Sequence, residues 1–544
     1  MNVAENRAEN GPARRRVVIP LHPFLFAAFP LLALYAHNLD HVPLLDTVYG
    51  LATTMLTTVC VWVVALVVLR NLRKSAIATS ATMVALATWS PLVEAIPWPA
   101  PVFVGTAGII AVAALVIALY RTRRPLLDTS SILNVAAGFL VLSSGWMIGS
   151  AFWRTSRPGS HLGMHAPILV ARGSASSPRA VSKRVHGPVT DKTADLPDVY
   201  YVILDAYGRA DSLKLFYNFD NGHFVRELER RGFYVAHHSR ANYDETPLCL
   251  ASSLNFDYLD DLARRVGPTG SLEACRAILD DNAVAASLSP LGYRYVYIGS
   301  GVSEAQVETA DVELNNRPPI PEVEAEIFGP DALNPSSPVH HARYDAHRAN
   351  LMGVFDSLDT VAKYPYKKFV FAHVLAPHPP FVLGPNGEAA YPRGPLTFAD
   401  GNWLLKQMSR PQYIEGYTGQ LQYVNRRALQ AIDNILARSR RPPIIIVQGD
   451  HGSRMNIDWE SLANTDVREP FSILNAYYVP AKVRGHLYDT ISPVNSFRVV
   501  LDEEFGAHYK LLPDRSYYST EEEPYAFTDV TGRTAIAPQR DHTP

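Results

Sequence analysis

The sequence predicts an α/β protein in two parts: five membrane-spanning helices, then a domain with a mainly parallel sheet. Residues 1–156 of the 544-residue chain are strongly apolar, whereas the rest has a mixed composition. In that second part, short runs of β-branched residues alternate with helical patterns. This alternation is typical of a parallel sheet covered by helices on both faces. The net charge of −2 gives no indication of nucleic-acid binding.

Five apolar segments in residues 1–156 approach the roughly 20 residues that a helix needs to cross a bilayer. They are about Val18–His37, Val48–Leu69, Ala76–Ile96, Val102–Tyr120 and Ser131–Trp153. The third is the weakest candidate, because it is rich in Thr and Ser and contains a proline and a glutamate. One such segment could be a buried helix of a soluble domain, but five in succession favour a transmembrane domain.

Basic residues predict the orientation of these segments. Arg and Lys gather before the first segment, between the second and third, and between the fourth and fifth: Arg14, Arg15, Arg16, Arg70, Arg73, Lys74, Arg121, Arg123 and Arg124. The two other loops, 37–46 and 97–101, contain neither residue type. Because short basic loops stay in the cytoplasm, an odd number of spans places the second part outside it.

Composition also divides the rest of the chain. Residues 157–196 are rich in Ser, Pro, Gly and Arg without hydrophobic periodicity, and we expect a linker there. It is either a solvated tether or a segment lying along anionic lipid. We expect the α/β domain at 197–515 and a loosely held, acidic then polar tail at 516–544. Cys249 and Cys275 fall in the outer part, where a disulfide is possible, and the sequence leaves open whether they form one.

The elements of the outer part follow from local patterns. Strands are expected at Val199–Leu204, Phe233–His237, Tyr293–Ile298, Lys368–Val374, Ile444–Gln448 and Ala476–Val479. Helices are expected at Ser212–Arg231, Leu250–Leu262, Asn282–Leu288, Ala342–Thr360 and Tyr413–Arg438. Polar, proline-bearing stretches at Ser303–Val339 and Pro377–Arg410 favour loops and short helices.

Two of the predicted strands end in residues that bind metals. Asp205 follows the first strand, and Gly449-Asp450-His451-Gly452 follows the Ile444 run. In open α/β sheets, chemistry is located beyond the carboxyl ends of the strands. Carboxylate oxygens and an imidazole nitrogen suit Zn²⁺ or Mn²⁺. The alternatives are that Asp205 caps the next helix and that Asp450-His451 is a capped turn.

Two further residues complete the candidate site. Thr246-Pro247 is a strong helix start, and a hydroxyl there faces N–H groups that suit a phosphoryl group. A bound metal could make this hydroxyl a nucleophile, whereas the structural alternative is a helix cap. His378 lies in a proline-stiffened turn after the Lys368–Val374 strand, where it is either structural or faces the site.

Taken in order, four motifs resemble those of the alkaline phosphatase/sulfatase superfamily. They are the strand-Asp at Asp205, Asn-Tyr-x-x-Thr ending at Thr246, His-x-Pro at His378 and Gly-Asp-His-Gly at Asp450. The resemblance covers roughly Asp198 to Leu512 and is best to lipoteichoic acid synthases and lipid A phosphoethanolamine transferases. It implies a sulfatase-like α/β sandwich, anchored in a bacterial-type inner membrane, with a periplasmic or extracellular catalytic domain.

The resemblance also implies roles for individual residues. Asp205, Asp450 and His451 would bind one divalent metal, Zn²⁺ or Mn²⁺. Thr246 would be the nucleophile and fourth ligand. Substrate contacts are expected from His378, at the phosphate or leaving group, and from Arg209 near the first strand. The substrate class implied is a membrane lipid or an envelope glycan.

The chain also departs from the family pattern. Sulfatases carry Cys or Ser in Cys/Ser-x-Pro-x-Arg, which the segment from Thr246 to Leu250 does not match. A second Asp, common after the first, is replaced by Ala206, which argues against a full two-metal site. The remaining histidine of the transferases has no evident counterpart.

We therefore expect a membrane-anchored, metal-dependent phosphotransferase or phosphodiesterase that attacks a phosphodiester, such as a phospholipid headgroup, through Thr246. The alternative on the same fold is a sulfuric-ester or phosphomonoester hydrolase. A non-enzymatic membrane scaffold is the third hypothesis, and the presence of all four candidate ligands argues against it.

Overall fold

The structure is a computed structural model. It describes residues 19–37, 44–95, 100–124, 126–155, 196–301, 305–315, 338–392 and 396–536. The chain forms two compact units, Met1–Ile168 and Leu169–Pro544. Of the linker expected at 157–196, only residue 196 is among the described residues.

The N-terminal unit contains the five expected helices. They are α1 (His22–His37), α2 (Leu44–Leu69), α3 (Leu72–Ala95), α4 (Ala100–Arg121) and α5 (Leu127–Thr155). By length and composition, three helices of the described part can cross a membrane, at Gly50–Leu69, Val104–Arg121 and Leu127–Ser150. A shorter apolar stretch covers His22–Ala36 in α1. The helices are confirmed, and five membrane crossings stay a prediction.

Polar contacts join the helices of this unit, while apolar side chains face outward. Asn134 of α5 accepts hydrogen bonds from the backbone N–H groups of Leu21 and His22, at 2.9 and 2.8 Å. Val135 and Leu142 on the same helix are both 74% exposed. A helix surface that exposes large apolar side chains needs an apolar surrounding, and lipid supplies one.

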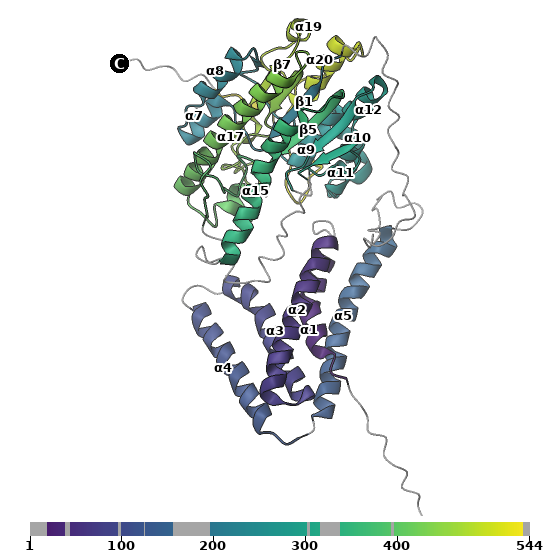
Figure 1. The fold of residues 1–544 in the computed structure, drawn as a ribbon, viewed down its shortest axis with the longest axis vertical. Helices are drawn as coiled ribbons and strands as arrows, with labels where there is room; N and C mark the ends of the chain where they lie inside the picture. Colours follow the sequence, from purple (N-terminus) through teal and green to yellow (C-terminus); the bar gives the residue numbers. More distant parts are fainter. Residues whose placement is uncertain are drawn as a thin grey trace, which may run out of the picture. The chain divides into compact units, whose positions relative to one another are not determined.

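The second unit is built on one seven-stranded sheet (Figure 1). Its strands, in spatial order, are β2 (Tyr234–Val235), β7 (Asn475–Tyr478), β6 (Ile444–Gln448), β1 (Val199–Leu204), β5 (Lys368–Val374), β3 (Arg294–Ile298) and β4 (Val312–Leu314). Neighbours from β6 to β4 pair in parallel, and β7 pairs antiparallel with both β6 and β2. The mainly parallel α/β sheet is confirmed.

Both faces of this sheet are buried. In β1, the side chains of Tyr200, Val202 and Leu204 enter one core cluster, and those between them enter the other, because successive side chains of a strand alternate in direction. The first face packs against α7 (Ala210–Tyr217), α8 (Gly222–Arg230), α15 (Pro338–Val361) and α17 (Arg410–Arg438). The second packs against α9 (Thr246–Asn255), α11 (Glu273–Asp280), α12 (Ala283–Leu288) and α20 (Pro493–Phe505). Burial on both faces explains the near-continuous apolar runs in the sequence.

Two expected helices are each divided in the structure. The stretch expected at Ser212–Arg231 forms α7 and α8, because Asn218 takes a left-handed conformation (φ 50°) that ends α7. The stretch expected at Leu250–Leu262 forms α9 and α10 (Asp260–Val266), and Phe256 ends α9 in the same way (φ 41°). The sequence did not predict β4, α11 or α20.

The segment expected to be a loose tail packs onto the α/β unit. Strands β8 (Tyr517–Tyr518) and β9 (Thr528–Asp529) pair there. Tyr518 and Tyr525 are buried, and the Ser516 hydroxyl donates to the Ala241 carbonyl at 2.7 Å. The folded unit therefore extends past residue 515, and residues 537–544 lie outside the described part.

Cys249 and Cys275 are free and buried, so the structure contains no disulfide between them. The Cys249 thiol donates to the Tyr243 carbonyl at 3.2 Å, and Cys275 Sγ lies 3.3 Å from the Tyr525 hydroxyl. Burial raises the pKa of Cys275 to about 12, which keeps this thiol protonated and unreactive.

Candidate metal centre and catalytic site

Three adjacent parallel strands bring the candidate site together. The sheet places β1 between β6 and β5. Asp205 directly follows β1, Asp450 and His451 follow β6, and His378 follows β5. Since the carboxyl ends of parallel neighbours meet at one edge, residues far apart in the sequence converge there.

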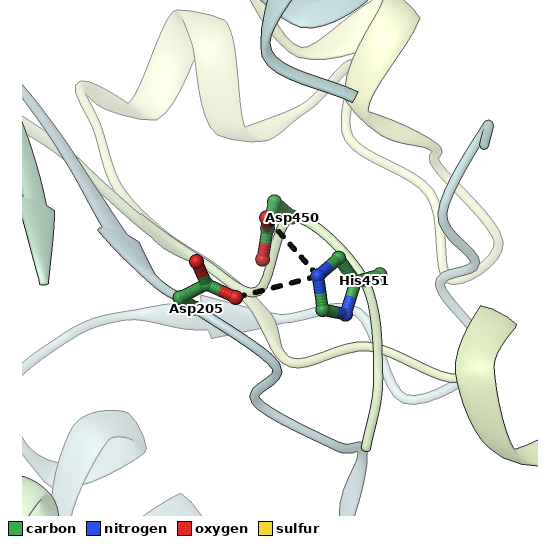
Figure 2. A group of neighbouring side chains, drawn as sticks. All are labelled: Asp205, Asp450 and His451. Carbon is green, nitrogen blue, oxygen red and sulfur yellow. Dashed lines mark ion pairs between the residues drawn. The ribbon is translucent and has the colours of Figure 1, made fainter. Parts of the chain in front are cut away.

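Asp205, Asp450 and His451 form a group that could hold a metal ion (Figure 2). One ligand atom from each residue lies within 4.8 Å of the others. His451 Nε2 is 3.3 Å from Asp205 Oδ1 and 3.4 Å from Asp450 Oδ2. All three residues are buried, and the structure brings them together; their role as metal ligands stays a prediction.

The backbone at Ala206 orients Asp450. Its N–H donates to Asp450 Oδ1 at 3.2 Å, and the Tyr417 hydroxyl donates to its carbonyl at 2.8 Å. Ala206 has a φ of 61°, a left-handed conformation that costs a non-glycine residue roughly 1 kcal/mol or more. The Ala206 N–H thus holds Asp450 Oδ1, whereas Asp450 Oδ2 has no hydrogen-bond partner among the described residues.

His451 is oriented by the residue that follows it. Its Nδ1 lies 2.8 Å from the Gly452 carbonyl oxygen, which can only accept, so Nδ1 carries the proton. In the neutral ring Nε2 then keeps its lone pair, as a metal ligand requires. Glycine is needed at 452, because a Cβ there would lie 2.3 Å from the Glu469 carbonyl oxygen. A Cβ at Gly449 would meet the Tyr207 carbonyl oxygen at 2.5 Å.

His373, within β5, contacts the carboxylate oxygen of Asp205 that does not face His451. Its Nε2 lies 3.1 Å from Asp205 Oδ2, and its Nδ1 lies 2.7 Å from the Ser300 hydroxyl. Burial by itself raises the pKa of Asp205, but His378, His373 and His451 together hold this pKa well below its ordinary value. Asp205 is therefore an ionised carboxylate.

The residues fit a divalent cation. Asp205 Oδ1 and Asp450 Oδ2 are buried, and neither has a hydrogen-bond partner among the described residues. A buried carboxylate oxygen without a partner is costly. These two atoms and His451 Nε2 face one another, so one cation would satisfy all three.

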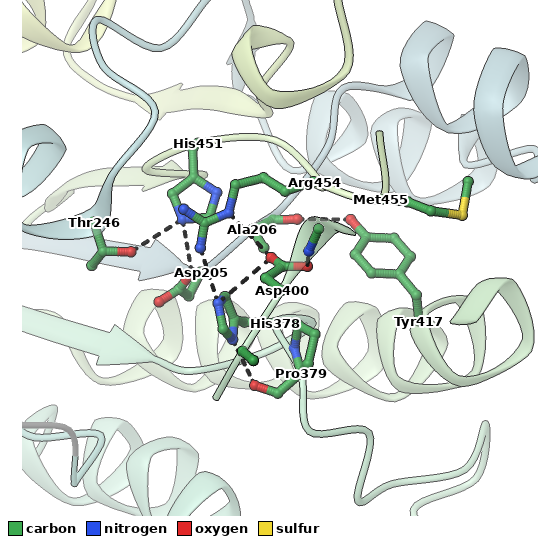
Figure 3. A network of polar contacts seen from close by, with 12 residues as sticks. Asp205, Ala206, Thr246, His378, Pro379, Asp400, Tyr417, His451, Arg454 and Met455 are labelled. Atoms are coloured by element: carbon green, nitrogen blue, oxygen red, sulfur yellow. Dashed lines mark hydrogen bonds and ion pairs between the residues drawn. The ribbon is translucent and has the colours of Figure 1, made fainter. Parts of the chain in front are cut away.

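Thr246 presents its hydroxyl to this group (Figure 3). It is the first residue of α9, and Glu245 occupies the N-cap position. Its Oγ1 lies 3.1 Å from His451 Nε2, so the side chain points at the candidate metal ligands. The Glu245 side chain does not hydrogen-bond to the first N–H groups of α9. Among the described residues, the Thr246 hydroxyl contacts His451 and does not cap the helix.

His378 faces the same site and is oriented by two contacts. Its Nδ1 lies 2.6 Å from the carbonyl oxygen of the next residue, Pro379. Arg454 Nη2 lies 3.0 Å from His378 Nε2. A carbonyl only accepts and a guanidinium only donates. The neutral ring therefore carries its proton on Nδ1 and accepts a hydrogen bond at Nε2.

Arg454 and Asp400 complete the network drawn in Figure 3. Arg454 Nε lies 3.1 Å from Asp400 Oδ2, and Nη1 donates to the Asp244 carbonyl at 2.7 Å. Burial raises the pKa of Asp400, but Arg454 and His378 outweigh it, and the pKa is lowered. Burial also raises the pKa of Asp244, to about 8.

Arg209, expected to contact substrate, has other partners. Its Nε and Nη2 donate to Asp211 at 2.7 and 2.9 Å, and its Nη1 donates to the Ser239 carbonyl at 2.6 Å. These contacts hold the loop between β1 and α7, and a substrate contact of Arg209 stays a prediction. A second guanidinium, that of Arg454, lies beside His378.

Sequence reasoning missed three polar residues of the site, His373, Asp400 and Arg454. His373 follows four apolar residues within a buried strand, which is a signal that the sequence offers. Arg454 follows the Gly-Asp-His-Gly motif by two residues, a weaker signal. Asp400 lies in a loop-rich stretch with no pattern that marks it.

Comparisons with known proteins gave matches only among solved structures. No protein-family model and no curated protein matches the chain. The periplasmic domain of EcEptC from Escherichia coli is 12% identical, with a TM-score of 0.39 over 63% of this chain and 96% of that one. Lipooligosaccharide phosphoethanolamine transferase A from Neisseria meningitidis, an integral membrane protein, is 13% identical, with a TM-score of 0.36 over 89% and 94%. A 2-O GAG sulfatase is 13% identical, with a TM-score of 0.36 over 60% and 73%.

Proposed function

We propose that this protein is a membrane-anchored, metal-dependent phosphotransferase or phosphodiesterase with Thr246 as its nucleophile. The observation that carries the proposal is the convergence of the Thr246 hydroxyl with two unpartnered carboxylate oxygens and His451 Nε2. A hydroxyl at a helix N-terminus, beside a group suited to a divalent cation, is an arrangement that favours attack on phosphorus.

The cation is expected to be Zn²⁺ or Mn²⁺, held by Asp205, Asp450 and His451, with Thr246 as fourth ligand. When bound, it would lower the pKa of the Thr246 hydroxyl and neutralise charge on the substrate phosphate. The donor set of two carboxylates, one imidazole and one hydroxyl suits either ion.

The proposed reaction has two steps. In the first, the Thr246 hydroxyl releases its proton to solvent, its oxygen bonds to phosphorus, and the bond from phosphorus to the leaving alcohol breaks. The leaving oxygen takes a proton from water. In the second, an acceptor hydroxyl or water loses a proton and bonds to phosphorus, and the Thr246 oxygen leaves and is protonated again.

His378 has a positioning role in this mechanism. Its proton on Nδ1 is held by a backbone carbonyl, and its Nε2 accepts from Arg454. The ring therefore has no N–H directed at the site with which to protonate a leaving group. We propose that it keeps Arg454 in place beside the substrate phosphate.

The substrate class is inferred from the membrane helices and the site together. In the described part of the chain, three apolar helices long enough to cross a bilayer precede the α/β unit, which supports a membrane protein with a substrate in the same membrane or envelope. We propose a phosphodiester such as a phospholipid headgroup as donor. The distribution of the basic loops supports an extracytoplasmic catalytic unit, and we propose that the membrane is a bacterial-type inner membrane.

The test is to trap the covalent intermediate. Full-length protein in detergent, given Zn²⁺ or Mn²⁺ and headgroup-labelled phosphatidylethanolamine, should carry a phosphoryl-type adduct at Thr246 by peptide mass spectrometry. Thr246→Ala should form no adduct and show no turnover. Its stability should fall by only about 0.5–1.5 kcal/mol, the net value of one hydrogen bond.

Thr246→Ser is the matched variant, because it keeps the hydroxyl, and we expect it to retain part of the activity. A Thr246→Ala protein that still turns over phosphodiesters would exclude the proposed mechanism. Turnover of p-nitrophenyl sulfate or of p-nitrophenyl phosphate in preference to a diester would favour the alternative hydrolase.

A further inference from the structure

A second pair of ligand-type atoms lies beside the candidate metal group. His378 Nε2 and Asp400 Oδ2 are 3.7 Å apart, and both side chains are buried. An imidazole nitrogen and a carboxylate oxygen at this spacing could share a metal ion. The guanidinium of Arg454 bridges them instead, at 3.0 Å from the nitrogen and 3.1 Å from the oxygen.

We propose that Arg454 takes the place of a second metal ion, so that the site combines one metal with one fixed guanidinium. We further propose, resting on the proposed function, that Arg454 binds a non-bridging oxygen of the substrate phosphate and selects phosphodiesters. The first proposal rests on the position of the guanidinium between His378 and Asp400. The second rests on the N–H groups that it has left to donate.

Arg454 keeps donors available for a ligand. A guanidinium has five N–H groups. Among the described residues it has three acceptors: Asp400 Oδ2, the Asp244 carbonyl and His378 Nε2. Each terminal nitrogen therefore retains one N–H. Paired N–H groups of this kind match two oxygens of a phosphate.

The guanidinium is held in a fixed position. It lies 4.8 Å from the centroid of the Trp459 ring, a cation–π contact. Asp400 is itself held by the Gly401 N–H at 2.8 Å and by the Tyr413 hydroxyl at 2.6 Å. Glu469 accepts from the backbone N–H of Met455, the next residue, at 3.1 Å. A donor held this firmly needs no reorganisation when charge develops on the phosphate.

The charge of Arg454 bears on substrate choice. Burial lowers its pKa, but Asp400, Glu245 and other carboxylates outweigh burial and raise it, so the side chain stays a monocation. It supplies one positive charge where a second metal would supply two. A phosphodiester carries one negative charge and a phosphomonoester up to two, so a site with less positive charge discriminates in favour of the diester.

Metal content tests the first part without reference to activity. Full-length wild-type protein in detergent, dialysed against Zn²⁺, should contain one zinc per chain. Arg454→His places a third ligand beside His378 and Asp400, and we expect two zinc ions per chain. Two ions in the wild type, or one in Arg454→His, would overturn the assignment of Arg454 to this place.

Kinetics test the second part. Arg454→Met should lower kcat/KM for bis-p-nitrophenyl phosphate on the order of 10²-fold, as removal of a fixed donor to a developing oxyanion does. Arg454→Lys keeps the charge without the paired donors and should recover only part of that loss. Arg264→Met, at an exposed arginine of α10, is the matched control and should leave kcat/KM unchanged.

Different results would contradict the role of Arg454 and the function of Thr246. If the wild type forms the Thr246 adduct but Arg454→Met keeps full diester activity, the role of Arg454 is wrong and the proposed function stands. If Arg454→Met lowers diester and monoester turnover equally, Arg454 does not select phosphodiesters. If no phosphoester is turned over by the wild type, the proposed function fails, and the zinc count still decides the first part.

Discussion

His373 Nε2 lies 3.1 Å from Asp205 Oδ2, across the pairing of β5 with β1. On its other side, His373 Nδ1 lies 2.7 Å from the Ser300 hydroxyl. The imidazole lies at ion-pair distance from Oδ2, although its Nε2 makes no hydrogen bond among the described residues, and Oδ1, which also has no partner there, faces His451. Contacts of this kind fix the orientation of a metal ligand.

We predict that His373→Phe weakens metal binding about 10- to 100-fold, the usual effect of removing such a contact. The reason is that Asp205 loses the group that orients it, although every ligand remains. Chelator competition measures the metal dissociation constant directly. Ser300→Ala removes only the hydroxyl that contacts His373 Nδ1, so it should have a smaller effect in the same direction. Unchanged affinity in a folded His373→Phe protein would contradict this role.

Asp450→Asn should lower the metal content of purified protein sharply. The amide oxygen can still accept from Ala206 N–H, so the local backbone should be kept, but the charge that a cation needs is lost. Metal analysis after dialysis is the measurement. Asp433→Asn, at a surface carboxylate paired with Arg231, serves as the control and should keep the wild-type content. Equal metal in both variants would exclude the assigned ligand.

Glu469 should make the stability of the α/β unit depend on pH near neutrality. Burial raises its pKa from an ordinary value of 4.5 to about 7, so the folded state binds this proton more tightly than the unfolded state. The stabilisation is complete below the unfolded pKa and is lost as pH rises through the folded one. Between about pH 4.5 and 7, the interval between the unfolded and folded pKa values, the melting temperature should fall more steeply with rising pH for the wild type than for Glu469→Gln. Parallel slopes would show that Glu469 does not titrate in this range.

The orientation of the membrane domain can be tested with reporters. A reporter that is active only outside the cytoplasm should be active when fused after Pro544, because the basic loops alternate between sides across five spans. The same reporter fused after Arg123, in a basic loop, should be inactive. If the fusion after Pro544 is inactive, the number of spans is even, and α3 is the first helix to reconsider.

The sequence determined most strands of the large sheet and the candidate ligands that follow two of them. Strands buried on both faces appear as continuous apolar runs. The strands that precede Asp205 and Gly449-Asp450-His451 could therefore be predicted from adjacent residues. The basic loops and the long apolar segments of the N-terminal unit can also be recognised from adjacent residues alone. Thr246-Pro247 identified the start of α9 for the same reason, since a helix start depends on a few adjacent residues.

Only the tertiary structure decided which side chains meet and in what orientation. The order β6-β1-β5 brings Arg454 to His378 and His373 to Asp205, and strand order is not encoded in any single segment. The direction of the Thr246 hydroxyl, toward His451, depends on how α9 packs on the sheet. The physical reason is that a pattern in the sequence reports burial and local conformation, whereas a contact between strands depends on their pairing and register.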